Sequence, residues 1–352
     1  MSQSACSVFD WSKVLISEDL SFNDALKVLS AGGYQIALVQ KANGRVAGIV
    51  TDSDVRKALL RGVRLDDTVS LVMNTDPKVI LSRSIPHDIN GLMKNQNVFH
   101  LPIVDDQNRF EGLYIAPQLN PKKYNPETIV IMAGGKGKRL MPLTANTPKP
   151  MLPVHGKPML EHILDRLRED GFKNVIISVN YLSERITSYF QDGSKFDMNI
   201  SYLYEDKPLG TAGALSGLDS KTRENPVIVT NADILSGISY SDLLIYFRRN
   251  TSNGLMAVRT QEWQNPFGVV QSNGSHITNI IEKPTHYYQV NAGLYVLDNK
   301  LLDLLTPNSY CDMPDLFRMG LEINLNLQVY PLHEQWLDIG RPKDYDIANK
   351  ES

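Results

Sequence analysis

Residues 130–150 read V-I-M-A-G-G-K-G-K-R-L-M-P-L-T-A-N-T-P-K-P, and this stretch decides how the rest of the chain is interpreted. The apolar run at residues 129–132 is short enough for a buried strand, and a glycine-rich, basic loop follows it. Glycines let backbone N–H groups approach a polyanion closely, and basic side chains neutralise it. The stretch therefore predicts a phosphate-binding loop at the end of a strand, where open α/β sheets bind ligands. The loop residues are Gly134, Gly135, Lys136, Gly137, Lys138 and Arg139.

Two better-known phosphate loops do not fit this stretch. A Walker loop needs the pattern G-x-x-x-x-G-K-[ST], which is missing here. A dinucleotide fingerprint opens a long helix, which Pro142 and Pro148 would interrupt. A tight surface turn is the alternative for any glycine cluster. It is less favoured here because a second basic element, residues 148–150, lies in the same short span.

The motif G-G-x-G-x-R-L-x-P-L-T, followed by P-K-P-M-L-P-V and G-K-P, resembles the signature of sugar-1-phosphate nucleotidyltransferases. The resemblance covers residues 127–352 and implies that an NTP and a sugar 1-phosphate form an NDP-sugar and pyrophosphate. Many members of that family have Thr or Ser where this chain has Lys138, so this lysine has no assigned role.

The order of segments in residues 127–352 agrees with such a domain. Apolar, β-branched runs at residues 129–132, 175–179 and 227–230 alternate with helical patterns. One of these patterns, at residues 159–169, places four apolar side chains on one face. A βαβ rhythm of this kind predicts an α/β fold with a Rossmann-like, mostly parallel sheet.

Composition limits the other function classes. The 352 residues suggest two or three domains, and the net charge of −3 gives no general attraction to nucleic acid or to an anionic membrane. Cys6 and Cys311 are too few for a disulfide framework. The polar start of the chain lacks a signal-peptide core, and no apolar run is long enough to span a bilayer. We therefore expect a cytoplasmic protein without nucleic-acid or membrane partners.

Residues 1–120 contain a repeat. The segments at 36–51 and 100–115 each read as strand, turn and strand, and a helical pattern precedes each of them. A repeat of this size indicates duplication. Residues 117–126 carry three prolines and no apolar periodicity, so we place a linker at residues 121–126, before the domain at residues 127–352.

Residues 48–55 resemble the end of a CBS domain, so the repeat resembles a tandem CBS (Bateman) module, a kind that often binds nucleotides. The resemblance implies that Thr51 and Asp54 contact a regulatory nucleotide. A helix cap and a turn hydroxyl are an equally good interpretation of these two residues. The second copy has Ile115 and Gln118 at the equivalent positions, so at most one good site is expected. The module could instead dimerise the protein, and we expect a homo-oligomer.

The nucleotidyltransferase resemblance also assigns a base-reading segment after the strand-like residues 199–203. It implies that Glu205 reads the base, together with the nucleotide-binding residues Leu209, Gly210 and Thr211. A carboxylate only accepts hydrogen bonds, and guanine offers two adjacent donors, so Glu205 favours GTP. The alternative is a solvated glutamate in a charged loop.

A buried strand that ends in Asp233 is a good place for a Mg²⁺ ligand. The resemblance pairs Asp233 with Asp338 on one Mg²⁺ ion. It also implies that Arg139 and the loop hold the triphosphate, that Lys149 lies at the α-phosphate and that Lys283 holds the sugar phosphate. These residues would form one site for two anions. The sugar-binding residues it implies are Gly268, Glu282 and Asn291.

The layout as a whole resembles guanylyltransferases that make GDP-glucosamine for legionaminic-acid synthesis. It implies GTP and glucosamine 1-phosphate as substrates, in the supply of precursors for bacterial surface glycans or nonulosonic acids. Mannose- or heptose-1-phosphate guanylyltransferases are alternatives. A further alternative is a non-catalytic nucleotide sensor with the same fold, although the presence of all the predicted cations and carboxylates disfavours it.

Overall fold

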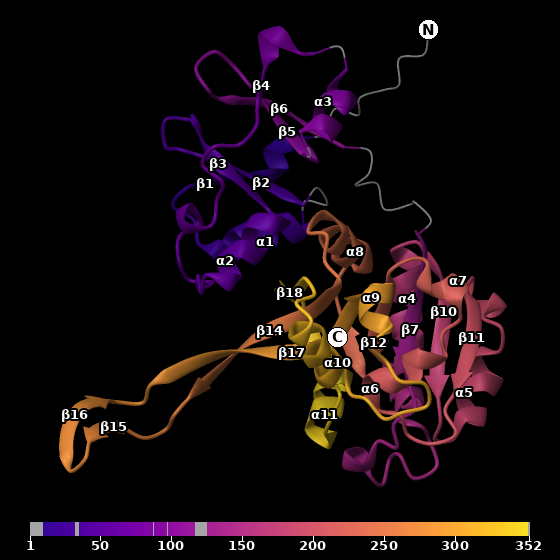
Figure 1. Cartoon of the computed structure of the whole chain (residues 1–352). Helices are drawn as coiled ribbons and strands as arrows, with labels where there is room; N and C mark the ends of the chain where they lie inside the picture. The colour runs from indigo at the N-terminus through magenta and orange to yellow at the C-terminus, as the bar shows by residue number, and fades with distance from the viewer. Residues whose placement is uncertain (1–9, 32–34, 87, 97, 117–124, 351–352) are drawn as a thin grey trace, which may run out of the picture. The chain divides into compact units, whose positions relative to one another are not determined.

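The structure is a computed structural model that describes residues 10–31, 35–86, 88–96, 98–116 and 125–350 (Figure 1). The chain divides into two compact units, residues 1–121 and residues 122–352. The two units are described separately below.

Unit 1 contains the predicted repeat. In the first copy β1 pairs in parallel with β2, and β2 pairs antiparallel with β3. In the second copy β4, β5 and β6 pair in the same way, which confirms the predicted strands and their duplication. The elements are η1 (Trp11–Val14), β1 (Leu15–Ser17), α1 (Phe22–Ala31), β2 (Ile36–Gln40), β3 (Val46–Thr51), α2 (Asp52–Leu60), η2 (Val69–Leu71), β4 (Ile80–Leu81), η3 (Ser82–Ser84), α3 (Ile89–Asn95), β5 (His100–Val104) and β6 (Phe110–Ile115).

Unit 2 is built on a seven-stranded sheet in the order β11-β10-β7-β12-β17-β14-β18. Every neighbouring pair is parallel except the two that involve β17, so β17 alone runs against the other six strands. The mostly parallel α/β sheet is as predicted. Its strands are β7 (Asn125–Met132), β10 (Phe172–Val179), β11 (Asn199–Tyr204), β12 (Val227–Asn231), β14 (Gly254–Gln264), β17 (Thr285–Leu297) and β18 (Leu327–Pro331).

Helices and short ladders complete unit 2. The predicted helix at residues 159–169 is confirmed as α4. The helices are α4 (Met159–Glu169), α5 (Ser183–Phe190), α6 (Gly210–Gly213), α7 (Ser220–Arg223), α8 (Tyr240–Arg249), α9 (Asn299–Leu302), α10 (Met313–Glu322) and α11 (Pro342–Lys350). The 3₁₀ turns are η5 (Lys138–Leu140), η6 (Lys149–Met151), η7 (Ser194–Phe196) and η8 (Ala214–Gly217). The remaining strands are β8 (Pro153–Val154), β9 (Lys157–Pro158), β13 (Ile234–Ser236), β15 (Val269–Asn273), β16 (His276–Ile281) and β19 (Trp336–Asp338).

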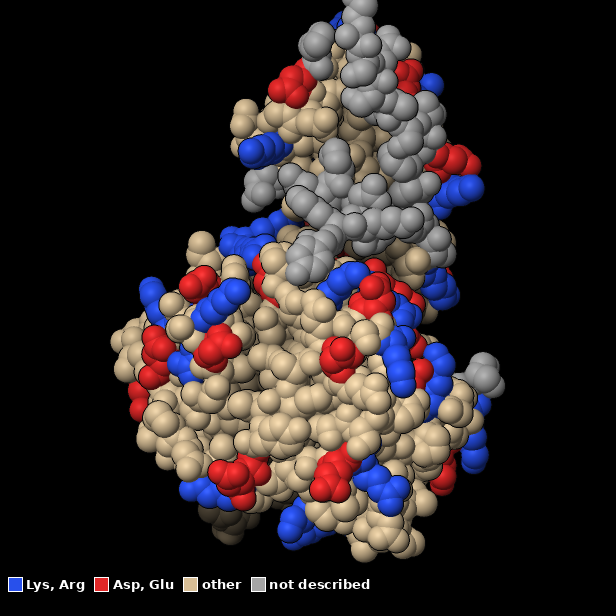
Figure 2. All heavy atoms as spheres, turned by 90° about the vertical axis from the view of Figure 1, so that its right-hand side faces the viewer, with Lys and Arg blue, Asp and Glu red and all other residues tan. Residues whose placement is uncertain are grey.

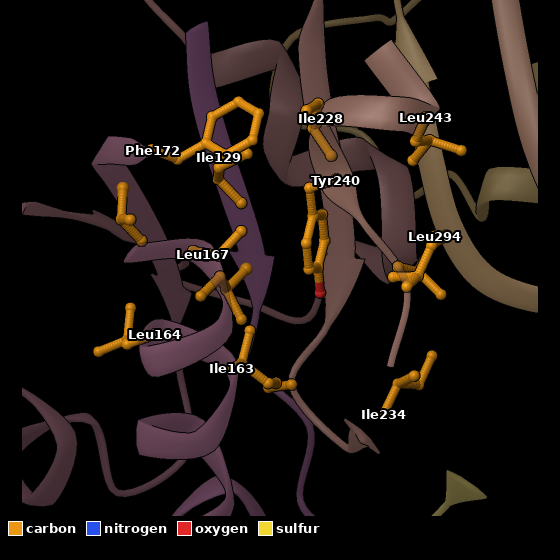
Figure 3. Packing of buried hydrophobic residues seen from close by; sticks show 14 of the residues in the cluster. Ile129, Ile163, Leu164, Leu167, Phe172, Ile228, Ile234, Tyr240, Leu243 and Leu294 are labelled. Carbon is orange, nitrogen blue, oxygen red and sulfur yellow. The ribbon is translucent and has the colours of Figure 1, made fainter. Parts of the chain in front are cut away.

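Both faces of the large sheet are buried, because alternate residues of each strand pack on opposite sides. Ile129 and Ile131 of β7 lie in the core beneath α4, α5 and α8, whereas Val130 lies in the core beneath α9 and α10. Figure 3 shows the first of these cores, with Leu164 of α4 and Tyr240 of α8 among its residues. Helix layers on both faces leave the ends of the strands as the open part of the sheet.

Within the predicted linker, residues 121–126, the structure describes only Asn125 and Pro126. These are the first two residues of β7 rather than linker residues, while residues 121–124 lie outside the described ranges. A proline is tolerated at the beginning of a strand, where its missing N–H costs little. The Asn125 side chain holds this end of the strand by donating to the backbone oxygen of Asp170 (2.8 Å).

A long arm extends from the large sheet. We define the arm as residues 260–289, which comprise the distal parts of β14 and β17 together with the β15–β16 hairpin between them. The β14–β17 ladder continues without a break from Val258 opposite Asn291 to Gln264 opposite Thr285. Figure 1 shows the resulting ribbon projecting away from the layers of unit 2.

The face of unit 2 drawn in Figure 2 carries no large area of a single charge sign. Lys and Arg alternate there with Asp and Glu around a broad uncharged area. None of the helices in the described part of the chain is both long enough and apolar enough to cross a membrane.

Candidate active site

A cavity of about 500 Å³ opens at the carboxyl ends of β7 and β12. Five segments that are distant in the sequence contribute to its lining. Its lining residues are Met132, Ala133, Gly134, Gly135, Gly137, Lys138, Arg139, Leu140, Lys149, Pro150, Glu205, Pro208, Gly210, Thr211, Asn231, Ala232, Asp233, Tyr310 and Gly340. The predicted phosphate loop and the predicted base segment thus border one space.

The side chain of Thr144 holds the predicted phosphate loop in place. The buried Thr144 hydroxyl donates to the backbone oxygen of Gly137 (2.9 Å). Gly137 has φ +60°, and a Cβ atom on it would lie 2.9 Å from the Thr144 methyl group, so both conformation and space favour glycine. Lys138 and Arg139 follow with exposed side chains that border the cavity. Short 3₁₀ turns at residues 138–140 and 149–151 take the place of a long helix here, as the prolines predicted.

Lys149 is the buried cation of the cavity. Its side chain is 11% exposed, and its Nζ forms an ion pair with Oδ2 of Asp233. Burial of a charge is costly unless the charge is paired, so this partner is what makes an ionised lysine acceptable here. The pair joins η6 to the end of β12, 84 residues further along the chain.

Asp338 reaches the same region through a second, smaller sheet. β13 and β19 pair antiparallel, with Ile234 opposite Asp338, and the amide of Ile339 donates to the backbone oxygen of Asp233 (3.0 Å). The pKa of Asp338 is raised above its usual value by desolvation and by the charge of Asp233, and the charges of Lys149 and Arg139 offset this only in part. The two predicted metal-binding carboxylates are therefore brought together beside two cations.

Glu205 is fixed by the protein on both of its carboxylate oxygens. Oε1 accepts from the hydroxyl of Ser178 (2.6 Å), and Oε2 accepts from the amide of Leu209 (3.0 Å). A Cβ on Gly134 would lie 2.7 Å from Oε1, so the loop glycine makes room for this carboxylate. A carboxylate oxygen can accept a second hydrogen bond, so base reading by Glu205 stays a prediction.

The segment after Glu205 is tied to the residues before α10. Gly210 has φ +80°, and a Cβ on it would lie 2.5 Å from the backbone oxygen of Cys311. The amide and the hydroxyl of Thr211 both donate to Oδ1 of Asp312 (3.0 and 3.2 Å). The predicted nucleotide residues Gly210 and Thr211 border the cavity, whereas Leu209 is buried below it.

None of the predicted sugar residues is among the described residues that line the cavity. Asn291, at the root of the arm, donates to the hydroxyl of Tyr295 (2.7 Å), a phenol whose pKa burial raises to about 12. Gly268, Glu282 and Lys283 lie on the arm, and no arm residue is among the described residues that line the cavity. The expectation that these residues join the triphosphate residues in one two-anion site therefore differs from the structure, because the continuous β14–β17 ladder carries them away from the cavity.

Thr51 and Asp54 in unit 1 form a capping box at the start of α2. Oδ2 of Asp54 accepts from the amide (2.9 Å) and the hydroxyl (2.6 Å) of Thr51. This is the cap geometry that the sequence offered as an alternative, and a nucleotide contact by these residues stays a prediction. In the second copy Ile115 occupies the register position of Thr51, and Gln118 lies outside the described residues.

Several residues of the region were not found from the sequence. Asn231, Tyr310 and Gly340 line the cavity, although the sequence analysis assigned no role to any of them. At the arm root, the guanidinium of Arg259 lies over the ring of Trp336, 5.7 Å from its centroid, and donates to its backbone oxygen (3.2 Å). Asn231 is the last residue of β12, two positions before Asp233, so its place at the end of a buried strand was the signal that could have identified it.

Comparison with known proteins agrees with this geometry. The nucleotidyl transferase family model matches residues 128–352, and the CBS domain model matches residues 11–61. The chain belongs to the nucleotidyl transferase family. Within unit 1 the CBS match covers the first copy of the repeat, the copy that keeps Thr51 and Asp54.

The relatives of this family member include named guanylyltransferases. The mannose-1-phosphate guanylyltransferase of Mycobacterium tuberculosis is 32% identical over 236 residues, which are 61% of this chain and 62% of the relative. The mannose-1-phosphate guanylyltransferase catalytic subunit beta of Dictyostelium discoideum is 32% identical over 223 residues, with the same coverage. The chain thus spans about 62% of the length of these curated relatives.

A solved structure supports the nucleotidyl transferase fold. It is a protein from Bacillus anthracis in complex with sucrose, named as a candidate glucose-1-phosphate thymidylyltransferase. It matches with a TM-score of 0.51 and 24% identity, over 63% of this chain and 94% of its own length. At this identity the match concerns the fold of unit 2 and not its substrates.

Proposed function

We propose that the protein transfers a nucleotidyl group from an NTP to a sugar 1-phosphate, giving an NDP-sugar and pyrophosphate. The observation that carries this proposal is the convergence of the glycine loop and the Lys149–Asp233 pair on one cavity, with Asp338 held beside Asp233 by the β13–β19 ladder. A triphosphate needs backbone donors and cations, and the reaction needs these groups held in place beforehand. The family of the chain agrees with such an activity.

The residues have distinct roles in this proposal. Arg139 and the amides of residues 134–137 hold the triphosphate tail and the departing pyrophosphate. Lys149 neutralises charge at the α-phosphate as an oxygen of the sugar phosphate attacks the phosphorus in line. The sugar phosphate is already ionised at neutral pH, so the step requires no general base.

A divalent cation, which we propose to be Mg²⁺, suits the carboxylates of Asp233 and Asp338. The donors are hard oxygen ligands. Desolvation and, after it, the negative charge of Asp233 raise the pKa of Asp338, and a bound cation would offset both effects. When bound, the ion would neutralise phosphate oxygens of the NTP. Lys149 would then exchange part of its interaction with Asp233 for the phosphate.

We propose GTP as the nucleotide. The acceptor-only carboxylate of Glu205 borders the cavity, and guanine offers two adjacent donors. The curated relatives named above carry guanylyltransferase in their names. Glucosamine 1-phosphate is the sugar we propose, from the layout of a CBS module before the transferase, with bacterial surface glycan or nonulosonic-acid precursors as the product class. Mannose 1-phosphate is the second candidate, because the relatives are named for it.

Pyrophosphate release across a matrix of four NTPs and the glucosamine, mannose and heptose 1-phosphates tests this function. We expect the highest kcat/KM with GTP and glucosamine 1-phosphate, and loss of turnover when EDTA removes divalent cations. Highest turnover with mannose 1-phosphate would replace the proposed sugar. Nucleotide binding without turnover in any combination would favour the non-catalytic sensor.

A further inference from the structure

The arm has an unusual surface for a part of a folded chain. Eight large apolar side chains in its 30 residues are more than a third exposed, with Phe267 at 73% and Ile277 at 63%. All residues of β16 are exposed, as are four of the five in β15. The exposed apolar residues are Trp263, Phe267, Val270, Ile277, Ile280, Ile281, Tyr287 and Tyr288.

A ribbon of this kind has little to stabilise it by itself. A two-stranded hairpin is marginally stable in water, and unpaired strand edges invite pairing with another chain. The arm stacks its own rings only partly, as in Trp263 against His286 with centroids 6.2 Å apart. Large apolar side chains exposed in such number on one short segment indicate an interaction site.

The chemistry of the arm identifies the class of its partner. Only Glu262, Glu282 and Lys283 are charged among its 30 residues. Nucleic acid and anionic membranes require clustered cations, which the arm lacks. Aromatic and β-branched side chains without charge are typical of the core of a protein interface.

A second copy of the chain offers a matching surface beside the cavity. Tyr310, which lines the cavity, is 65% exposed. Met141 directly follows Leu140 of the cavity lining and is 55% exposed, and Leu143, two residues later, is 45% exposed. Each copy carries both an arm and such a rim. Two copies related by a two-fold axis would therefore bury both arms against both rims.

The cavity also lacks a cation for a second anion. The basic residues among its described lining are Lys138, Arg139 and Lys149, and Asp233 already pairs with Lys149. The carboxylates of Asp233 and Asp338 offset part of the charge of these three cations. The positive charge that remains is smaller than the negative charge of an NTP and a sugar phosphate together. Lys283 is exposed on the arm, beyond a ladder that runs about 20 Å outward from Asn291 to Thr285.

We infer that the protein is a dimer in which the arm of each copy lies across the cavity of its partner and supplies Lys283 to the sugar phosphate. Glu282 would arrive with it as an acceptor for the sugar hydroxyls or amine. Its carboxylate lies over Gly268, where a Cβ would be 2.8 Å from Oε2. This inference rests on the proposed function, and it makes each active site a product of two chains.

Mixing two defective variants tests the inference directly. One variant carries Lys149→Ala in the body, and the other carries Glu282→Ala with Lys283→Ala in the arm. Each alone should have little activity. If the arm acts on the partner, a mixture that has exchanged subunits contains dimers with one intact site and recovers about a quarter of wild-type turnover. No recovery, in a mixture shown to contain heterodimers, would mean that the arm acts on its own chain.

The mass of the wild-type protein in solution tests the dimer separately from catalysis. We expect a dimer by light scattering at micromolar concentration. Val270→Asp with Ile280→Asp should shift it to a monomer with an unchanged circular dichroism spectrum. Leu321→Asp, at an equally exposed position of α10, is the matched control and should remain a dimer. A wild-type monomer would overturn the inference, whereas a wild-type dimer without turnover in the substrate matrix would overturn the proposed function alone.

Discussion

The cavity and the arm of unit 2 are built in opposite ways. The cavity residues follow buried strands and are held by contacts between distant segments, as in the pairs Lys149–Asp233 and Thr211–Asp312. The arm residues lie along a two-stranded ladder, and many of their apolar side chains face solvent. Preorganised contacts of the first kind can bind a triphosphate without help, whereas the second kind needs another surface before it has a fixed position. Four substitutions test how far this difference extends, and they are given from the largest effect to the smallest.

Lys149→Ala should have the largest effect. It removes the buried cation at the proposed reacting phosphate and leaves Asp233 without its ion-pair partner. We expect kcat/KM to fall about 100-fold in a pyrophosphate-release assay. Lys157→Ala is the matched control, because Lys157 also pairs with an aspartate (Asp165, 3.1 Å) but lies away from the cavity lining. Equal rates for the two variants would remove Lys149 from the mechanism.

Gly134→Ala tests the rigidity of the cavity side. The new methyl group would lie 2.7 Å from a Glu205 carboxylate oxygen that the Ser178 hydroxyl holds in place. We expect the free energy of unfolding to fall by about 2 kcal/mol, measured with urea. Gly135→Ala is the control within the same loop, because no atom lies within 4 Å of its Cβ position. Equal stability of the two variants would mean that the loop or Glu205 shifts easily enough to accommodate the added methyl group.

Lys283→Ala tests the arm side. Loss of one charge-assisted contact to the sugar phosphate should raise the KM for that substrate about tenfold while the KM for GTP stays nearly constant. Lys300→Ala, an exposed lysine of α9 outside the arm, provides the control. A change in the KM for GTP instead would mean that Lys283 serves the nucleotide.

Glu205→Gln should have the smallest effect. The amide keeps one acceptor and introduces donors toward Ser178 and the base, so the ratio of kcat/KM for GTP over UTP should fall about fivefold. Ser178→Ala keeps the carboxylate and removes only its support, so it should preserve the preference more fully. An unchanged ratio in Glu205→Gln would show that backbone groups choose the base.

The sequence predicted the parts of the molecule whose signals are local. The apolar runs became β7, β10 and β12, and the helical pattern at residues 159–169 has its predicted bounds. Asp233 was found as a strand-terminal carboxylate. Its proximity to Asp338 came only from family resemblance, because the β13–β19 ladder joins residues about 100 positions apart and leaves no local trace.

The arm shows where such prediction stops. The motifs around Gly268, Glu282 and Lys283 were identified, but the direction in which β14 and β17 carry them was not. Straight and bent ribbons have the same alternation of side chains, so the sequence pattern does not distinguish them. Likewise, Thr51 and Asp54 fit a nucleotide site and a helix cap equally well in the sequence, and the cap is the contact that the structure shows.

The β13–β19 ladder has a consequence for how the protein is made. Ile234 pairs with Asp338, so the second carboxylate enters the site only after 105 further residues (338 − 233) have followed Asp233 out of the ribosome. At common translation rates this interval lasts roughly 5 to 20 seconds. During it the nascent chain holds the glycine loop, Lys149 and the first carboxylate without the second. Fragments that end inside this interval would contain most of the proposed nucleotide-binding residues, yet they would lack the pair of carboxylates on which the proposed metal depends.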